Sequence, residues 1–83
     1  MDSLRTAVEQ TILDLANKKT LIDYVTTSEV MIRLPKQPTH INREIVIQQM
    51  KIVAHLHSWT VWAGTSGPMI DVRSITGPLT GSL

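Results

Sequence analysis

The chain has 83 residues, of which 42% are apolar, and a formal net charge of +1. This length allows one domain with a thin core and leaves no room for a second, while the ordinary apolar fraction excludes wholesale disorder. The absence of cysteine excludes disulfides and thiolate metal sites, and it fits a reducing cytoplasm. The N-terminal residues do not resemble a signal peptide, and no apolar stretch approaches the roughly 20 residues of a membrane helix.

The charges are unevenly distributed along the chain. Residues 1–30 hold three basic and five acidic side chains, a net charge of −2, whereas residues 31–83 hold five basic and two acidic ones, a net charge of +3. A positive second half suits a surface that faces phosphates. An ordinary solvated surface explains the same split.

The first predicted element is an amphipathic helix over residues 3–17, with Asp2 or Ser3 as its N-cap. Residues 20–25, TLIDYV, fit either a short strand or a continuation of the helix after a break. The first helix is indicated by apolar residues that recur at helical spacing, namely Leu4, Val8, Ile12 and Leu15.

Thr26 and Glu29 form the T-x-x-E pattern of a capping box, which predicts the start of a second helix. This helix covers residues 28–34 and ends before Pro35, because a residue that precedes proline avoids helical geometry. Its apolar face is supplied by Val30, Met31 and Leu34.

Residues 35–41, PKQPTHI, predict a loop, and Asn42 after it is a favourable N-cap. A third helix is expected over residues 43–58, with Ile41 able to pack on Val46 as a hydrophobic staple. At 100° per residue its expected apolar face holds Ile45, Val46, Met50, Ile52, Val53 and Leu56, and its polar face holds Glu44, Gln48, Lys51, His55 and Ser58.

The period then changes to that of strands. Residues 59–63 and 69–74 predict a β-hairpin around the turn residues 65–68, and the alternation of Ile70 and Val72 with Asp71 and Arg73 supports it. Residues 75–83 are expected to form a flexible tail. The sequence therefore predicts an α+β domain over residues 1–74, with three helices and a C-terminal β-hairpin.

This order of elements resembles the winged-helix branch of the helix-turn-helix superfamily. The resemblance covers residues 3–74, lies in element order and length, and points to no specific family. It implies that residues 43–58 are a recognition helix for the DNA major groove and that the hairpin is the wing. The expected DNA contacts are Lys36, His40, Asn42, Arg43, Gln48, Lys51 and Arg73.

Other readings of the same residues remain open. Gln48 and Lys51 also suit any solvated helix face, and Glu44 on that face repels phosphate. Trp59 and Trp62 suit a lock between the hairpin and the helices, or an exposed protein interface if one of them stays in solvent. His55 and His57 point about 200° apart on a helix, so no metal site is expected there.

We therefore expect a non-enzymatic DNA-binding protein, a small transcription regulator or a replication or recombination accessory factor, in the cytoplasm. Its expected partners are double-stranded DNA and a second copy in a homodimer, with no cofactor, no small-molecule substrate and no membrane. The first alternative is a winged-helix adaptor that binds proteins only. The second is an all-helical dimer that binds double-stranded RNA, which requires that residues 59–74 do not form a hairpin.

Overall fold

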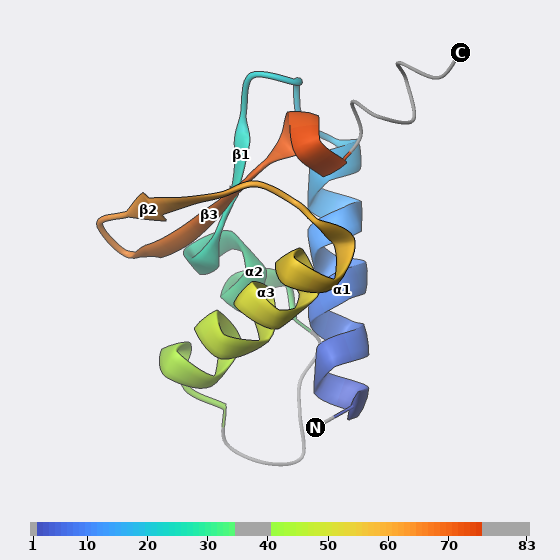
Figure 1. Ribbon diagram of the computed structural model, residues 1–83. Helices are drawn as coiled ribbons and strands as arrows, with labels where there is room; N and C mark the ends of the chain where they lie inside the picture. The colour runs from blue at the N-terminus through green and yellow to red at the C-terminus, as the bar shows by residue number, and fades with distance from the viewer. Residues whose placement is uncertain (1, 35–40, 76–83) are drawn as a thin grey trace.

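The computed structural model describes residues 2–34 and 41–75, which fold into three helices and a three-stranded antiparallel sheet (Figure 1). The fold class is α+β, as predicted. The loop residues 35–40, and the predicted tail from residue 76 onward, lie outside the described residues. In chain order the elements are α1 (Asp2–Asn17), β1 (Tyr24–Thr26), α2 (Thr27–Arg33), α3 (Arg43–His57), β2 (Val61–Gly64) and β3 (Gly67–Asp71).

Helix α1 buries the stripe that its spacing predicts. Val8 and Ile12 are completely inaccessible to solvent, and Leu4 and Leu15 are nearly so. Thr11 lies within this buried face, where its hydroxyl donates to the carbonyl of Ala7 one turn earlier. The interior hydroxyl is therefore satisfied inside its own helix. No helix in the described part of the chain is long and apolar enough to cross a membrane.

Strand β1 settles the ambiguity of residues 20–25. The chain turns at residues 21–22 and then extends, so that Val25 lies opposite Ile70 of β3 and both are completely buried. Three residues of suitable composition do not choose between helix and strand by themselves. The edge of β3 decides the outcome, because it offers backbone partners and a buried site for Val25.

The sheet has the order β1-β3-β2, and the predicted hairpin is present but shorter than expected. Its turn is Thr65–Ser66 alone, since Gly64 pairs with Gly67. The expected second strand over 69–74 was wrong at both ends: β3 begins at Gly67 and stops at Asp71, and residues 72–75 form a helical turn. The reason is local, because the Asp71 carboxylate accepts from the N–H of Arg73 and caps that turn. With two strands in residues 59–74, the premise of the all-helical alternative is contradicted.

Pro68 occupies a position in β3 where its missing N–H costs no ladder bond. The N–H of Asp71 donates to the carbonyl of Thr60, so Asp71 forms its backbone hydrogen bonds toward β2. Because this direction alternates along a strand, Met69 and Gly67 also bond toward β2, whereas Pro68, opposite Ala63, does not. Its carbonyl extends past the end of β1 and accepts a hydrogen bond of 2.8 Å from the buried hydroxyl of Thr27. The Thr27 hydroxyl thus supplies the hydrogen-bond donor that a longer β1 would have supplied from its backbone.

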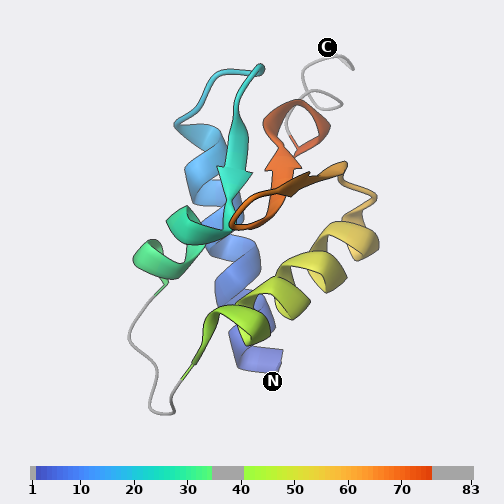
Figure 2. The ribbon, with the colours of Figure 1, turned by 90° about the vertical axis from the view of Figure 1, so that its left-hand side faces the viewer.

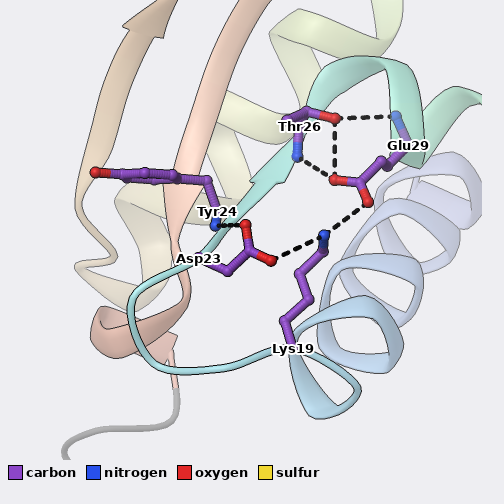
Figure 3. A network of polar contacts seen from close by, with 5 residues as sticks. All are labelled: Lys19, Asp23, Tyr24, Thr26 and Glu29. Carbon is purple, nitrogen blue, oxygen red and sulfur yellow. Dashed lines mark hydrogen bonds and ion pairs between the residues drawn. The ribbon is translucent and has the colours of Figure 1, made fainter.

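The predicted capping box at the start of α2 is confirmed, and it is part of a larger network (Figure 3). The Thr26 hydroxyl oxygen accepts from the N–H of Glu29, whose carboxylate accepts from the N–H of Thr26. Lys19, which follows α1, donates to Glu29 at 2.7 Å and lies 3.7 Å from Asp23. Partial burial acts to raise the pKa of Glu29, but the hydrogen bonds from Lys19 and Thr26 outweigh it and hold that pKa below its ordinary value. The network ties the end of α1 to the start of α2.

Helix α3 lies across α1 (Figure 2) and shares the core with it, but its buried face is narrower than predicted. Ile52 is 37% exposed and Leu56 is 64% exposed, so the broad apolar face expected for this helix is not buried across its whole width. The contacts of α3 centre on Val46, Met50 and Val53, and the two exposed residues project from the edge of this stripe. Ala54 and Gln49 are buried in addition; Gln49 is tolerated because its side-chain oxygen accepts from Arg5 of α1.

Candidate nucleic-acid interface

The candidate interface is built on α3, whose two ends are fixed by local sequence. The Asn42 side-chain oxygen accepts from the N–H of Ile45 at 2.9 Å, which is the predicted N-cap. At the other end Ser58 takes the left-handed conformation, with φ of 58°, and its N–H donates to the carbonyls of Ala54 and His55 in the last turn. Asn42 was also predicted to contact phosphate, and in the structure its side-chain oxygen is engaged in capping.

The outer face of α3 is exposed in the described structure. Gln48, Lys51 and His55 are all exposed on the side opposite the core, where the polar face was expected. Glu44 shares this face near the N-terminus of the helix, where the helix dipole favours a carboxylate. The structure therefore brings Gln48 and Lys51 together on one surface, as the sequence predicted.

A groove of about 330 Å³ connects this face to the hairpin. Lys51 lines it from the helix, and Val61 to Gly64 of β2 line it from the sheet, with Gly67 and Pro68 of β3. The hairpin projects away from α1, with α3 beneath it (Figure 1). Lys51 thus stands between the outer face of α3 and the hairpin, and it is the one charged residue among those that line the groove.

Arg43 holds this arrangement together. Its guanidinium donates to the carbonyl of Ser66 in the hairpin turn at 2.7 Å, and to the hydroxyl of Ser28 on α2 at 3.2 Å. It was predicted as a DNA contact, and in the structure it joins the first residue of α3 to the tip of the hairpin and to the start of α2. The sequence gives no signal for this connection, because the partners lie 23 and 15 residues away.

The remaining predicted DNA contacts are Lys36, His40 and Arg73. Lys36 and His40 lie outside the described residues. Arg73 is exposed, but it belongs to the helical turn after β3, at the opposite end of that strand from Thr65–Ser66. Its predicted place on a hairpin strand was wrong.

The two tryptophans occupy different environments, as one of the two sequence readings expects. Trp59 is half-buried against the core and stacks on His57, with ring centroids 4.4 Å apart. Trp62 is 50% exposed on β2, beside Met69 of β3. Trp59 therefore helps to hold the end of α3 to the chain that follows, and Trp62 is presented to solvent.

The histidines do not form a metal site within residues 2–34 and 41–75, where no group of three potential ligands occurs. His55 is exposed. His57 lies 3.2 Å from the carboxylate of Glu9 on α1, a partner that the local spacing did not reveal. The contact links α1 to the C-terminal end of α3.

A small hollow of about 180 Å³ lies between the hairpin turn and the start of α2. Its walls are rich in hydroxyl groups, contributed by Thr26 to Ser28 at the start of α2 and by Thr65 and Ser66. No ionisable side chain lines it, so it offers no group for acid–base chemistry.

No known protein family, curated protein or solved structure matches this chain.

Proposed function

We propose that this chain is a winged-helix domain that binds duplex DNA, with α3 as the recognition helix and the β2–β3 hairpin as the wing. The observation that supports the proposal best is the continuous surface from the outer face of α3, through the groove beside Lys51, to the hairpin. A helix of this kind fits the major groove of B-DNA, and a hairpin beside it reaches the adjacent backbone or minor groove.

Each residue has a definite task in this proposal. Lys51 neutralises a phosphate or contacts guanine, and Gln48 reads a base edge. Arg43 acts indirectly: by holding the Ser66 carbonyl it sets the angle between α3 and the wing. In this role the chain serves as a small transcription regulator or as a replication or recombination accessory factor in the cytoplasm.

The test is fluorescence anisotropy with a labelled duplex of mixed sequence, titrated at several salt concentrations. We expect the logarithm of the association constant to fall linearly with the logarithm of salt concentration, and Lys51→Glu to weaken binding and to reduce the slope by about 1. Lys18→Glu is the matched control, because Lys18 is exposed beyond the end of α1 and belongs neither to α3 nor to the groove lining. Equal effects of the two reversals, or no binding at low salt, would refute the proposal.

A second candidate is an adaptor that binds another protein, and a specific observation favours it. Trp62 and the neighbouring Val61, which is 40% exposed, present apolar surface on the hairpin. Exposed tryptophans are frequent anchors of protein interfaces. Co-purification of a stoichiometric protein that Trp62→Ala releases, together with no affinity for duplex DNA, would establish this function in place of the first.

A further inference from the structure

Strand β2 is an edge strand without a charged residue, a proline or a bulge of its own. The sheet order β1-β3-β2 places it at the margin, where no described strand follows it. Natural proteins protect such edges with lysine, proline or a bulge, whereas β2 reads Val-Trp-Ala-Gly and pairs with β3 in unbroken register. All four residues are exposed or half-buried.

The hydrogen-bond register identifies which groups face outward. The N–H of Asp71 donates to the carbonyl of Thr60, so Thr60 bonds toward β3. Because the direction alternates along a strand, Trp62 and Gly64 also bond toward β3, and Val61 and Ala63 present their N–H and C=O groups to the free edge. Pro68 opposite Ala63 agrees with this, since proline has no N–H to give to that pair.

This pattern is complementary to itself. If a second β2 runs antiparallel to the first, with the symmetry axis at Trp62, then Val61 faces Ala63 of the other copy and all four outward groups of each strand are paired. The two Trp62 residues then lie directly opposite each other at a non-hydrogen-bonded position, where cross-strand side chains are closest. Trp62 lies beside Met69, on the sheet face opposite to buried Ile70, so the two rings meet on the outer face of the sheet.

Charge also favours a second copy as the occupant. Residues 58–70 contain no ionisable side chain, so the two apposed strands bring no like charges of their own together, and Lys51 is the charged residue that lines the groove beside β2. A partner recognised through charge would find nothing to bind on this strand. Burial of exposed Trp62 and Val61 supplies apolar area, and paired aromatic rings add to it.

We propose that two copies of this chain associate through their β2 edges, forming a continuous six-stranded antiparallel sheet with Trp62 at the two-fold axis. The proposal concerns association in the absence of DNA, and its failure would leave the DNA-binding proposal untouched.

The first experiment measures the molecular mass of the purified full chain by sedimentation equilibrium over a hundredfold range of concentration. We expect a reversible monomer–dimer equilibrium, with the dissociation constant raised at least tenfold by Trp62→Lys or by Ala63→Pro. The proline removes only an outward N–H, so the β2–β3 ladder is retained, and circular dichroism checks that each variant is folded. A monomer at every concentration would overturn the proposal.

The second experiment tests the register. Mixing Trp62→Lys with Trp62→Glu should restore association as a heterodimer, because the opposite charges would lie face to face. The chain has no cysteine, so a single introduced cysteine reports directly on how close its two copies lie. Trp62→Cys should form a disulfide-linked dimer in a glutathione redox buffer at least tenfold faster than Val61→Cys. The reason is that the two copies of residue 62 would face each other, whereas the two copies of residue 61 would be displaced by two residues along the strands. Equal rates for these two variants and for Asp14→Cys on exposed α1 would overturn the register, and a dimer that is insensitive to all substitutions in β2 would assign the interface to another surface.

Discussion

Replacing Thr27 by valine removes one interior hydroxyl and leaves the shape of the side chain almost unchanged. Thr27 is 1% exposed, and its hydroxyl donates to the carbonyl of Pro68 at 2.8 Å. Pro68 is itself buried, so the carbonyl would lose its partner without gaining water. The substitution therefore removes the hydrogen bond that joins the start of α2 to β3 beyond the end of β1.

The expected cost follows from these quantities. A buried acceptor that loses its partner costs about 1–3 kcal/mol, and the added methyl group returns up to about 0.8 kcal/mol of apolar burial. We expect Thr27→Val to lower the free energy of unfolding by about 1–2 kcal/mol. For a domain of this size each kcal/mol lowers Tm by about 4–8 °C.

The assay is urea denaturation followed by circular dichroism and by tryptophan fluorescence. Thr20→Val, in the exposed connection after α1, is the matched control and should change stability by no more than about 0.5 kcal/mol. If Thr27→Val proves as stable as the parent protein while Thr20→Val behaves in the same way, the hydroxyl does not support the sheet and our account of Pro68 is refuted.

Three further predictions concern stability. Because the folded pKa of Glu29 lies below its ordinary value of 4.5, its ion pair with Lys19 should stabilise the fold fully above that value and progressively less as pH falls through the lowered pKa. Urea denaturation at a series of pH values across this range should show the fall in the free energy of unfolding, and Glu29→Gln should make that free energy less dependent on pH. Met50→Ala should cost about 2–5 kcal/mol in the same assay because Met50 is 1% exposed, whereas Leu56→Ala should cost less than about 1 kcal/mol because Leu56 is 64% exposed; comparable losses would restore Leu56 to the core. Ser58→Gly should increase the free energy of unfolding by up to about 1 kcal/mol, and so raise Tm, because the φ of 58° at Ser58 favours glycine. An unchanged or lower Tm would contradict this.

Much of the fold is predictable because its signals are local. The capping box at Thr26 and Glu29 and the N-cap at Asn42 each act within three residues, so they mark the starts of α2 and α3 without any knowledge of the rest of the chain. The spacing of Val8 and Ile12 likewise identifies the buried side of α1. The exposed polar residues of α3 follow from the same periodicity.

The misplaced residues share a different cause. Ile52 and Leu56 are apolar and correctly spaced for a wide buried face, yet no described element covers them sufficiently, so they remain exposed. Arg43 is an evident cation in the sequence, but its connection of α3 to Ser66 depends on where the hairpin turn lies in space. Gln49 is polar by composition and buried in fact, because Arg5 of another helix supplies its partner.

The sequence alone therefore determined where α3 begins and, to within one residue, where α1 and α2 begin, although Asp2 and Ser3, the expected N-cap candidates, both lie inside α1. It also determined which side of α1 is apolar and that residues 59–74 contain a hairpin, since these depend on contacts within a few residues. Tertiary structure alone decided that residues 24–26 form a strand, that Pro68 sits beside Thr27 and that β2 is left at the edge of the sheet. Those outcomes depend on which distant backbone and side-chain groups become neighbours, and local sequence does not specify that choice.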